Sequence, residues 1–330
     1  MSGRVYLITG GASLVGSHLA DHLLKIGASE VRLLDNFALG STATIQHLVD
    51  DKRVKLIRGD ILRLNGLIDA AAGAHGIFAL AGFLTLPLSQ NLPLGVEVNA
   101  MGMVNTLEAA RLAKVRRVIF SSSISVYGNT AADLMSEDVG FRTHELPPAS
   151  AIYSASKLLG ESMARFYALK HGVETNSLRF SSVYGERQHR RAVNAVFLAE
   201  AYEKIRKDIP PIIVGDGSEV HDYIHVRDVA TACYAAMTAP ASGEVFNIVT
   251  GVDTTLNTAV DLLLKISSKT GLKPMRQPDT REVRSSSVAK LNLDPGKAER
   301  LLRWRSEISL EDGLRSYIAW RESDEAGNAA

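Results

Sequence analysis

The feature that most constrains the fold is an alternation of short β-rich runs with amphipathic stretches. The strand-like runs are 4–9, 30–35, 53–60, 76–80, 117–122 and 174–180. Between them, 15–26, 96–112 and 152–170 place apolar residues three and four positions apart, as helices that cover a sheet do. Strands that alternate with helices in this way form parallel sheets. We therefore predict an α/β fold built on a doubly wound parallel sheet.

The alternation breaks into shorter pieces after residue 181. Helix-like stretches at 192–205 and 227–237 flank the glycine-rich segment "VGDGSEVHDYIHV". We predict a sheet domain over 1–181 and a smaller mixed α/β substrate-binding lobe over 182–322, which could return strands or helices to the first domain. The last residues, 323–330, lack apolar side chains that could anchor them, so we expect a disordered tail.

Charge and composition exclude several classes of partner. Thirty-seven basic residues offset 36 acidic ones, so no general field attracts nucleic acid or an anionic membrane surface. The single cysteine, Cys233, cannot form an internal disulfide, and no charged leader precedes an apolar segment at the amino terminus. The longest apolar run, 76–88, falls short of the roughly 20 residues that span a bilayer. We expect a cytoplasmic protein without nucleic-acid, membrane or metal partners.

The stretch "LITGGASLVGSHLADHLL" joins the first strand to the first helix and has the spacing of a dinucleotide-binding turn. Gly10 and Gly16 hold the outer positions of a G-x-x-G-x-x-G pattern, while Ser13 adds a Cβ and a hydroxyl at the middle one. Asp35 ends the second strand, where a carboxylate accepts ribose hydroxyls and would repel a 2′-phosphate, which favours NAD over NADP. Asp60 ends the third strand and either meets the adenine or caps the next helix. This pattern is typical of a Rossmann domain.

A second cluster joins the serine run "SSSISVYG" to the helix-starting motif "YSASK". Lys157 lies four residues after Tyr153, hence on the same face of the helix. We predict that Lys157 lowers the pKa of Tyr153 from its ordinary value of about 10, so that a phenolate can accept a hydroxyl proton. The Tyr-Lys spacing alone is common in surface pairs, but together with the turn, Asp35 and the serine run it is specific.

These motifs resemble those of the extended short-chain dehydrogenase/reductase family, in its NAD-dependent epimerase/dehydratase group. Within it, the likeness is to UDP-glucose 4-epimerase-like nucleotide-sugar epimerases. "TGGASLVGSHL", "LLDNFALGS", "EVNAMGMVNTLEAAR", "SSSISVYG" and "YSASK" carry it, and "LRFSSVYGERQ" and "VGDGSEVHDYIHVRDVA" extend it into the second half. The resemblance implies a homodimer formed through a four-helix bundle of 96–112 and 152–170.

The resemblance also implies roles for individual residues. Tyr153 would be the base, Lys157 would hold the nicotinamide ribose, and Ser123 would hydrogen-bond the reacting hydroxyl. Asn99 would contact the cofactor side. The implied NAD-binding residues are Gly10, Ser13, Leu14, Val15, Gly16, Asp35, Asn36, Asp60, Ile61, Leu80, Ala81, Gly82, Asn99, Ser121, Tyr153, Lys157, Phe180 and Val183.

The chain departs from the family pattern where the substrate would bind. Ile124 and Ser125 follow Ser123 where family dehydratases carry acidic residues, which disfavours dehydration and the decarboxylating branch. Ser182 stands for an asparagine and His221 for an arginine that meet the nucleotide diphosphate in the family, and neither supplies the arginine's charge and fork geometry. The predicted substrate-binding residues are Phe83, Thr85, Ser123, Ser125, Ser182, Arg190, His221 and Arg281.

Three functions remain open from the sequence. The leading one is an NAD-dependent epimerase of a sugar or nucleotide sugar, which oxidises a secondary hydroxyl to a ketone and reduces it again. The second is an NAD-dependent dehydrogenase of a free sugar, sugar acid or other secondary alcohol that releases NADH. The third is a non-catalytic NAD-binding sensor, against which the intact Ser123, Tyr153 and Lys157 argue.

Overall fold

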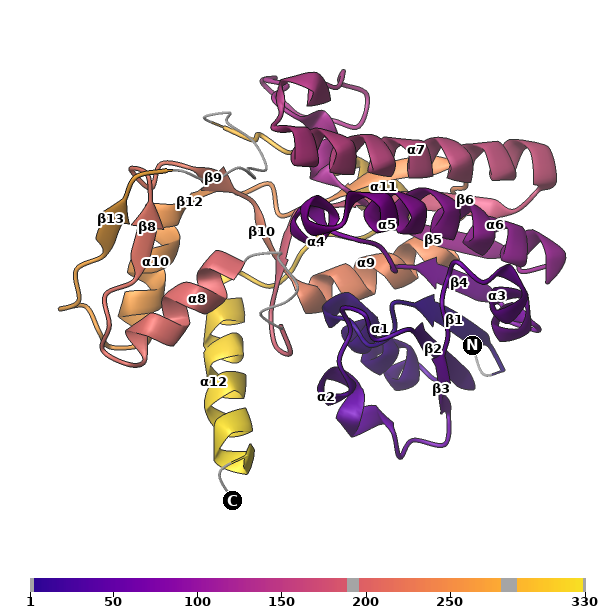
Figure 1. The fold of residues 1–330 in the computed structure, drawn as a ribbon, viewed down its shortest axis with the longest axis horizontal. Helices are drawn as coiled ribbons and strands as arrows, with labels where there is room; N and C mark the ends of the chain where they lie inside the picture. Colours follow the sequence, from indigo (N-terminus) through magenta and orange to yellow (C-terminus); the bar gives the residue numbers. More distant parts are fainter. Residues whose placement is uncertain (1–2, 189–195, 280–289, 329–330) are drawn as a thin grey trace.

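Seven parallel strands form the central sheet of the protein, in the order β11-β6-β5-β4-β1-β2-β3 (Figure 1). The computed structural model describes residues 3–188, 196–279 and 290–328. The chain order reverses between β1 and β4, which opens a crevice beyond the carboxyl ends of these two strands. The predicted doubly wound α/β fold is confirmed. The strands are β1 (Val5–Thr9), β2 (Glu30–Asp35), β3 (Val54–Arg58), β4 (Gly76–Ala79), β5 (Arg117–Ser123), β6 (Glu174–Phe180) and β11 (Glu244–Ile248).

Helices cover both faces of this sheet, which explains why its inner strands read as continuous apolar runs. In β1, Tyr6 and Ile8 point to one face and Leu7 points to the other, and all three are buried. One face packs against α1 (Leu14–Lys25), α9 (Val226–Thr238) and α11 (Gly296–Leu302). The other packs against α3 (Leu64–Ala71), α6 (Gly102–Leu112) and α7 (Pro148–His171).

The two long helical stretches predicted on the second face differ in regularity. The stretch 152–170 lies in α7, which begins with Pro148 in its first turn and ends at Gly172 with a φ of 68°. The stretch 96–112 is not one helix. It comprises the end of α5 (Leu92–Val96), a π-helical segment (Glu97–Met101) and α6. Such π-helical turns are frequent at functional sites.

The second lobe has its own apolar core, on the left in Figure 1, and mixes helices with two-stranded sheets. Its helices are α8 (Val196–Ile205), α10 (Leu256–Ile266) and α12 (Leu310–Asn328). The chain returns to the first domain through α9 and β11, the possibility left open by the sequence. The small sheets pair β10 (Tyr223–His225) with β7 (Ser182–Tyr184), β12 (Thr254–Thr255) with β9 (Val220–His221), and β13 (Met275–Gln277) with β8 (Ile212–Val214).

The carboxy-terminal end differs from the prediction of a disordered tail from residue 323. The last helix, α12, continues to Asn328. Its first half is anchored by the buried Leu314 and Tyr317, and a helix already nucleated extends readily through glutamate and alanine. The remaining short helices are α2 (Thr42–Ile45) and α4 (Thr85–Gln90).

Candidate active site

The turn between β1 and α1 is built so that two glycines cannot be replaced without a backbone shift. Gly10 has a φ of 71°, and a Cβ added to Gly16 would lie 2.4 Å from the Gly10 carbonyl oxygen. Ser13 is the N-cap of α1, where its Oγ accepts a hydrogen bond of 3.1 Å from the Gly16 amide. The Ser13 hydroxyl hydrogen stays free to donate. The turn therefore presents the close-packed backbone and helix N-terminus that hold a pyrophosphate.

Two carboxylates flank this turn at the ends of β2 and β3. Asp35 accepts hydrogen bonds from the Ala12 amide (2.9 Å) and the Phe37 amide (2.8 Å), and its burial raises its pKa against these two bonds. The Asp60 carboxylate accepts a hydrogen bond of 3.1 Å from the side-chain Nδ2 of Asn36. Asp60 does not cap α3, because Arg63 is the N-cap of that helix and makes no side-chain cap bond.

A groove of about 100 Å³ lies between the turn and these carboxylates. The glycine turn and the acidic ends of the strands match the pyrophosphate and ribose of a dinucleotide, so the residues present fit NAD. Phe83, predicted to bind substrate, lines this groove instead. The predicted NAD-binding residues that line it are Gly10, Ser13, Asp35, Asn36, Asp60, Ile61, Leu80, Ala81 and Gly82.

Ser123, Tyr153 and Lys157 come together where β5 ends against the start of α7. A hydrogen bond links the side chains of Tyr153 and Ser123. The Lys157 ammonium donates to the Ser121 carbonyl oxygen at 2.8 Å and lies 5.6 Å from the centre of the Tyr153 ring. The predicted catalytic residues therefore share one buried site.

The pKa values in this site correct one prediction. Burial raises the pKa of Tyr153 to about 12, and the bond with Ser123 opposes the rise only in part. Burial also lowers the pKa of Lys157 to about 8, against the attraction of Glu161. The predicted lowering of the Tyr153 pKa by Lys157 is not seen in this arrangement, in which the ammonium lies over the ring and donates to a main-chain oxygen.

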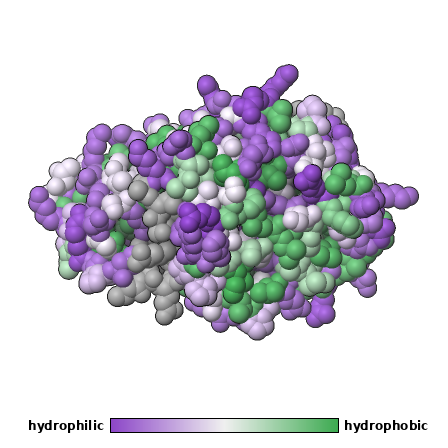
Figure 2. Space-filling view, turned by 90° about the horizontal axis from the view of Figure 1, so that it is seen from above, coloured by the Kyte–Doolittle hydropathy of each residue, from purple (hydrophilic) through white to green (hydrophobic). Residues whose placement is uncertain are grey.

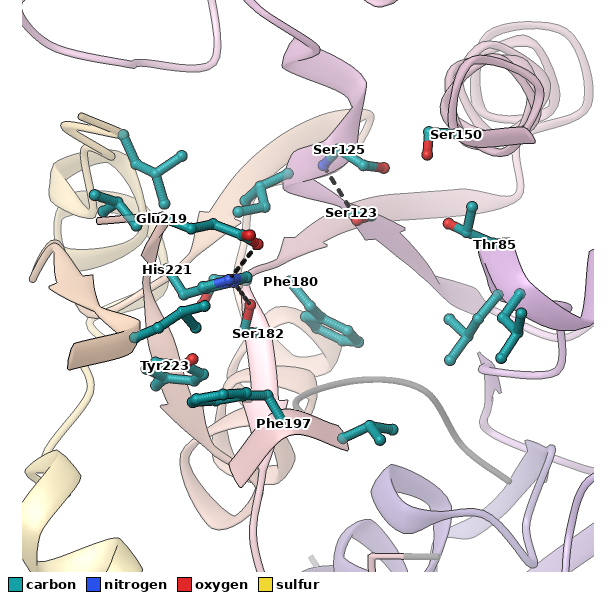
Figure 3. A pocket seen from close by; sticks show the side chains of 18 of the residues that line it. Thr85, Ser123, Ser125, Ser150, Phe180, Ser182, Phe197, Glu219, His221 and Tyr223 are labelled. Carbon is teal, nitrogen blue, oxygen red and sulfur yellow. Dashed lines mark hydrogen bonds and ion pairs between the residues drawn. The ribbon is translucent and has the colours of Figure 1, made fainter. Parts of the chain in front are cut away.

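A larger cavity of about 530 Å³ opens on the other side of Ser123 and Tyr153. Figure 3 shows Ser123 and Ser125 on one wall, Thr85 and Ser150 on a second, and Ser182 and His221 on a third. Ser125 Oγ is buried without a hydrogen-bond partner among the described residues. Five of the predicted substrate residues therefore line this cavity, together with Tyr153: Thr85, Ser123, Ser125, Ser182 and His221.

Glu219 and Tyr223 also line this cavity and were missed in the sequence. The signal was present, since Glu219, His221 and Tyr223 alternate along an extended segment, so their side chains point to the same side. His221 Nε2 lies 2.9 Å from Glu219 Oε1, and its ring stacks on Tyr223 at 5.3 Å between centres. Besides Glu219 and His221, the charged side chains on the described lining are Glu200 and Lys204 of α8.

Other predicted site residues lie elsewhere. Asn99 is absent from the described lining of both cavities, and its amide instead bonds the Phe83 nitrogen (2.7 Å) and the Phe83 oxygen (3.0 Å). Phe180, predicted to bind NAD, lines the larger cavity. Val183 and Leu14 are buried in the core, Val15 packs against it, and Ser121 Oγ donates to the Ala79 oxygen. Arg190 and Arg281 lie outside the described residues.

The described residues contain neither a candidate membrane-spanning helix nor a candidate metal cluster. Within 3–188, 196–279 and 290–328, no helix is both long and apolar enough to cross a membrane. The same ranges contain no group of three or more His, Cys, Asp or Glu side chains that could hold a metal ion.

Known proteins resemble the chain in sequence and in fold. A UDP-glucose 4-epimerase of Mycolicibacterium smegmatis is 32% identical over 321 residues, which cover 94% of this chain and 96% of that protein. The structure of a Thermus thermophilus UDP-glucose 4-epimerase with NAD has a TM-score of 0.82 at 28% identity and covers 97% of this chain and 99% of its own. The structure of a Thermotoga maritima UDP-glucose 4-epimerase with UDP-glucose has a TM-score of 0.82 at 26% identity. It covers 98% of this chain and 100% of its own.

A family model gives the same assignment. It describes the NAD dependent epimerase/dehydratase family and matches residues 6–249, a span that runs from β1 through β11 and includes Ser123, Tyr153 and Lys157. The match covers well over half of the 330 residues. The chain therefore belongs to the NAD dependent epimerase/dehydratase family, within the extended short-chain dehydrogenases/reductases, and is an enzyme whose cofactor is NAD.

Proposed function

We propose that the protein is an NAD-dependent epimerase that inverts a secondary hydroxyl of a nucleotide sugar through a ketone. The observation that carries the proposal is the position of Ser123 and Tyr153, which line the larger cavity at its border with the NAD groove. The loop after β4 joins the two spaces, because Gly82 and Phe83 line the groove while Leu84 and Thr85 line the cavity. A sugar in the cavity would thus lie beside the cofactor.

Ser123, Tyr153 and Lys157 would each have a separate role in the reaction. Ser123 hydrogen-bonds the sugar hydroxyl, and Tyr153 takes its proton during oxidation and returns it during reduction. Lys157, held by the Ser121 carbonyl, supplies positive charge beside the Tyr153 ring. NAD, when bound, accepts the hydride and gives it back.

Two neighbouring residues favour epimerisation over dehydration. Ile124 and Ser125 follow Ser123 and line the cavity, so the wall beside the reacting carbon carries an apolar side chain and a hydroxyl. Elimination of water from the sugar needs a carboxylic acid to protonate the leaving oxygen. The carboxylates on the described lining, Glu200 and Glu219, come from other elements, α8 and the segment before β9.

A dehydrogenase of an uncharged sugar is the second candidate. The observation that favours it is the pairing of His221 with Glu219, which places a carboxylate where a diphosphate would approach the wall. This reaction would use Ser123, Tyr153 and Lys157 in the same roles but would release a ketone and a reduced cofactor.

The two candidates are separated by following the cofactor. We expect the purified protein to retain NAD through gel filtration and to interconvert two nucleotide sugars with no net change in reduced-nicotinamide absorbance. Tyr153→Phe should lower turnover roughly 10²- to 10⁴-fold while NAD stays bound, because only the proton transfer is lost. Release of reduced cofactor in amounts equal to a free sugar consumed would instead identify the dehydrogenase.

We further propose a homodimer formed through α6 and α7. These helices pack side by side against the sheet. Their outer faces expose Leu112 of α6 and Leu159 and Phe166 of α7 by 45 to 52%, and Met101, which ends the π-helical segment before α6, is 51% exposed. Figure 2 shows apolar side chains gathered on the half of the molecule that holds the central sheet and these helices. Exposed apolar side chains on two neighbouring helices support an association between copies, which would bring four helices together.

A further inference from the structure

Three side chains on one face of α7 contact the last three residues of β5. They follow one another at four-residue spacing, and they are Tyr153, Lys157 and Glu161. The first two contact the Ser123 side chain and the Ser121 carbonyl oxygen, respectively. The Glu161 carboxylate accepts a hydrogen bond of 2.5 Å from the Ser122 hydroxyl. The two proposed proton-transfer residues thus belong to a row of three contacts, and the third contact is made by Glu161.

The third contact is anchored from a neighbouring strand, β6, which α7 also covers (Figure 1). Arg179 on β6 donates hydrogen bonds of 2.9 and 2.8 Å to the two carboxylate oxygens of Glu161. A helix advances about 1.5 Å per residue, so a slide of α7 by one residue would break these bonds. The pair therefore sets the height at which Tyr153 and Lys157 meet β5.

Arg179 is itself held in place from its other side. Its Nη1 donates to the Tyr127 hydroxyl at 2.9 Å and to the Glu137 carbonyl oxygen at 3.3 Å. Its guanidinium carbon lies 4.9 Å from the centre of the Tyr127 ring and 5.1 Å from that of Phe141. The planar guanidinium is thus fixed by hydrogen bonds and by aromatic rings, and it cannot follow a displacement of Glu161.

Glu161 also acts on the charge of Lys157. Both side chains are buried, and the carboxylate favours the charged ammonium, so it opposes the burial that lowers the pKa of Lys157 to about 8. The other groups close to the ammonium among the described residues carry no opposite charge. The Phe120 ring lies 5.3 Å away and the Tyr153 ring 5.6 Å away, and the loop after β4 contributes Gly82.

The charged groups on the other elements that pack against α7 are engaged elsewhere. Arg179 is bound to Glu161, and Glu108 on α6 accepts from Tyr167, ten residues further along α7 than Lys157. Without Glu161, two buried cations would face one another with no anion between them. The guanidinium keeps its proton at any ordinary pH, so the lysine would lose its own.

We propose that Glu161 is a positioning residue for proton transfer, which fixes Tyr153 and Lys157 against β5 and keeps the lysine charged. Glu161 is absent from the described lining of both cavities, so it acts through its neighbours. The inference rests on the proposed function, in which Tyr153 exchanges a proton with the sugar beside the charge of Lys157. Turnover should therefore depend on Glu161, whereas binding of the sugar should not.

The variant that tests this role removes both members of the buried pair. Glu161→Leu with Arg179→Met leaves no unpaired buried charge from the pair, so it should fold. With NAD and UDP-glucose, we expect its kcat to fall while KM stays within about threefold of the native value. The native-to-variant ratio of kcat should rise with pH toward about pH 8, by up to about tenfold for each pH unit that the Lys157 titration moves. A ratio that does not depend on pH would overturn the inference.

A second measurement does not use turnover. Lys157→Met is introduced into the native protein and into the double variant, and urea denaturation with NAD in excess gives the unfolding free energies. In the native background, the effect of Lys157→Met should begin to change near pH 8. In the double variant we expect the change to begin lower by roughly one pH unit or more, because the ammonium has lost its anion. The same onset in both backgrounds would contradict a role of Glu161 in the charge of Lys157.

Two controls separate this role from a loss of stability. Arg179→Lys keeps a positive charge beside Glu161 but not the guanidinium fork, so it should be less stable, with a kcat ratio that does not vary with pH. Glu203→Gln removes a carboxylate that is 12% exposed and bound by Arg321, on α8, and should leave the pH dependence of kcat unchanged. A pH-dependent ratio in either control would assign the effect to destabilisation and overturn the inference.

Failure of the proposed function is recognised separately. A native protein that converts no nucleotide sugar would overturn the epimerase function. The denaturation comparison would still decide whether Glu161 maintains the charge of Lys157, because it needs no substrate.

Discussion

At the scale of single residues, Lys157 is a buried lysine whose ammonium lies near two aromatic rings. Lys157 is 7% exposed, its ammonium lies 5.3 Å from the centre of the Phe120 ring, and burial lowers its pKa to about 8 from 10.5. Between these values the unfolded chain binds more protons than the folded protein. The contribution of Lys157 to the free energy of unfolding therefore rises as the pH increases from about 8 to 10.5. Below about pH 8 the buried charge destabilises the folded protein in full.

This sign gives a prediction for Lys157→Met. The difference in unfolding free energy between the native protein and the variant should shift in favour of the native protein by roughly 2 kcal/mol from about pH 8 to 9.5. Urea denaturation of both proteins at both pH values measures this difference. The contribution of tyrosines that titrate at higher pH is common to the two proteins and cancels in the difference. A difference independent of pH would mean that the ammonium is hydrated in the folded state.

Ser13 carries a second prediction at this scale. Its Oγ caps α1 by accepting from the Gly16 amide, and replacing a serine cap by glycine costs only a few tenths of a kcal/mol. Ser13→Gly should lower stability by less than about 1 kcal/mol and change NAD affinity by less than about tenfold, with the relative kcat/KM for different sugars unchanged. Chemical denaturation, NAD titration and competition assays measure these quantities. A switch of preferred sugar would contradict the separation of turn and cavity.

Among the elements, α7 and β6 are joined by a buried ion pair directly behind the catalytic residues. Arg179 on β6 donates two hydrogen bonds, of 2.9 and 2.8 Å, to the Glu161 carboxylate on α7, and their side chains are 3% and 8% exposed. Ser122 on β5 donates to the same carboxylate. Glu161 lies one helical turn after Lys157, so the pair fixes the height of α7 over the sheet.

Replacing one member of this ion pair should lower the free energy of unfolding more than replacing both members. Arg179→Met leaves a buried carboxylate without its partner, and we expect a loss of about 3 to 5 kcal/mol. The double variant Arg179→Met with Glu161→Leu should recover most of that loss, because no buried charge remains. Urea denaturation provides the measurement. Glu108→Gln, in the more exposed pair with Arg111, is the control and should change stability by less than about 1 kcal/mol.

At the scale of the whole molecule, the proposed dimer depends on the outer face of α7. Leu159→Glu combined with Phe166→Glu places two charges on that face, and we expect the dimer to dissociate at micromolar concentrations. Sedimentation velocity measures the mass. Val252→Glu, at a residue 60% exposed in the second lobe, should leave the mass unchanged. A native protein that sediments as a monomer would refute the interface.

The sequence predicted the sheet well because its signals are local. Six strand-like runs coincide within two residues with β1 to β6, since each is an apolar run bounded by turns. The predicted catalytic residues Tyr153 and Lys157 stand out in the sequence through their spacing within one helix, and the structure brings them close to Ser123. Properties that depend on packing between distant elements could not be predicted from the sequence. The burial that raises the pKa of Tyr153, the hydrogen-bond partners of Asn99 and the position of Tyr223 on the cavity wall all arise from contacts between elements far apart in the chain.

The loop after β4 has a consequence for how the enzyme handles its two ligands. The Asn99 side chain hydrogen-bonds both the main-chain nitrogen and the main-chain oxygen of Phe83. Gly82, before Phe83, lines the NAD groove, and Leu84, after it, lines the larger cavity. The backbone of residues 82–85 is therefore shared by the two binding spaces. Redesigning Leu84 or Thr85 for a new sugar would thus also alter how tightly the protein retains its cofactor between turnovers.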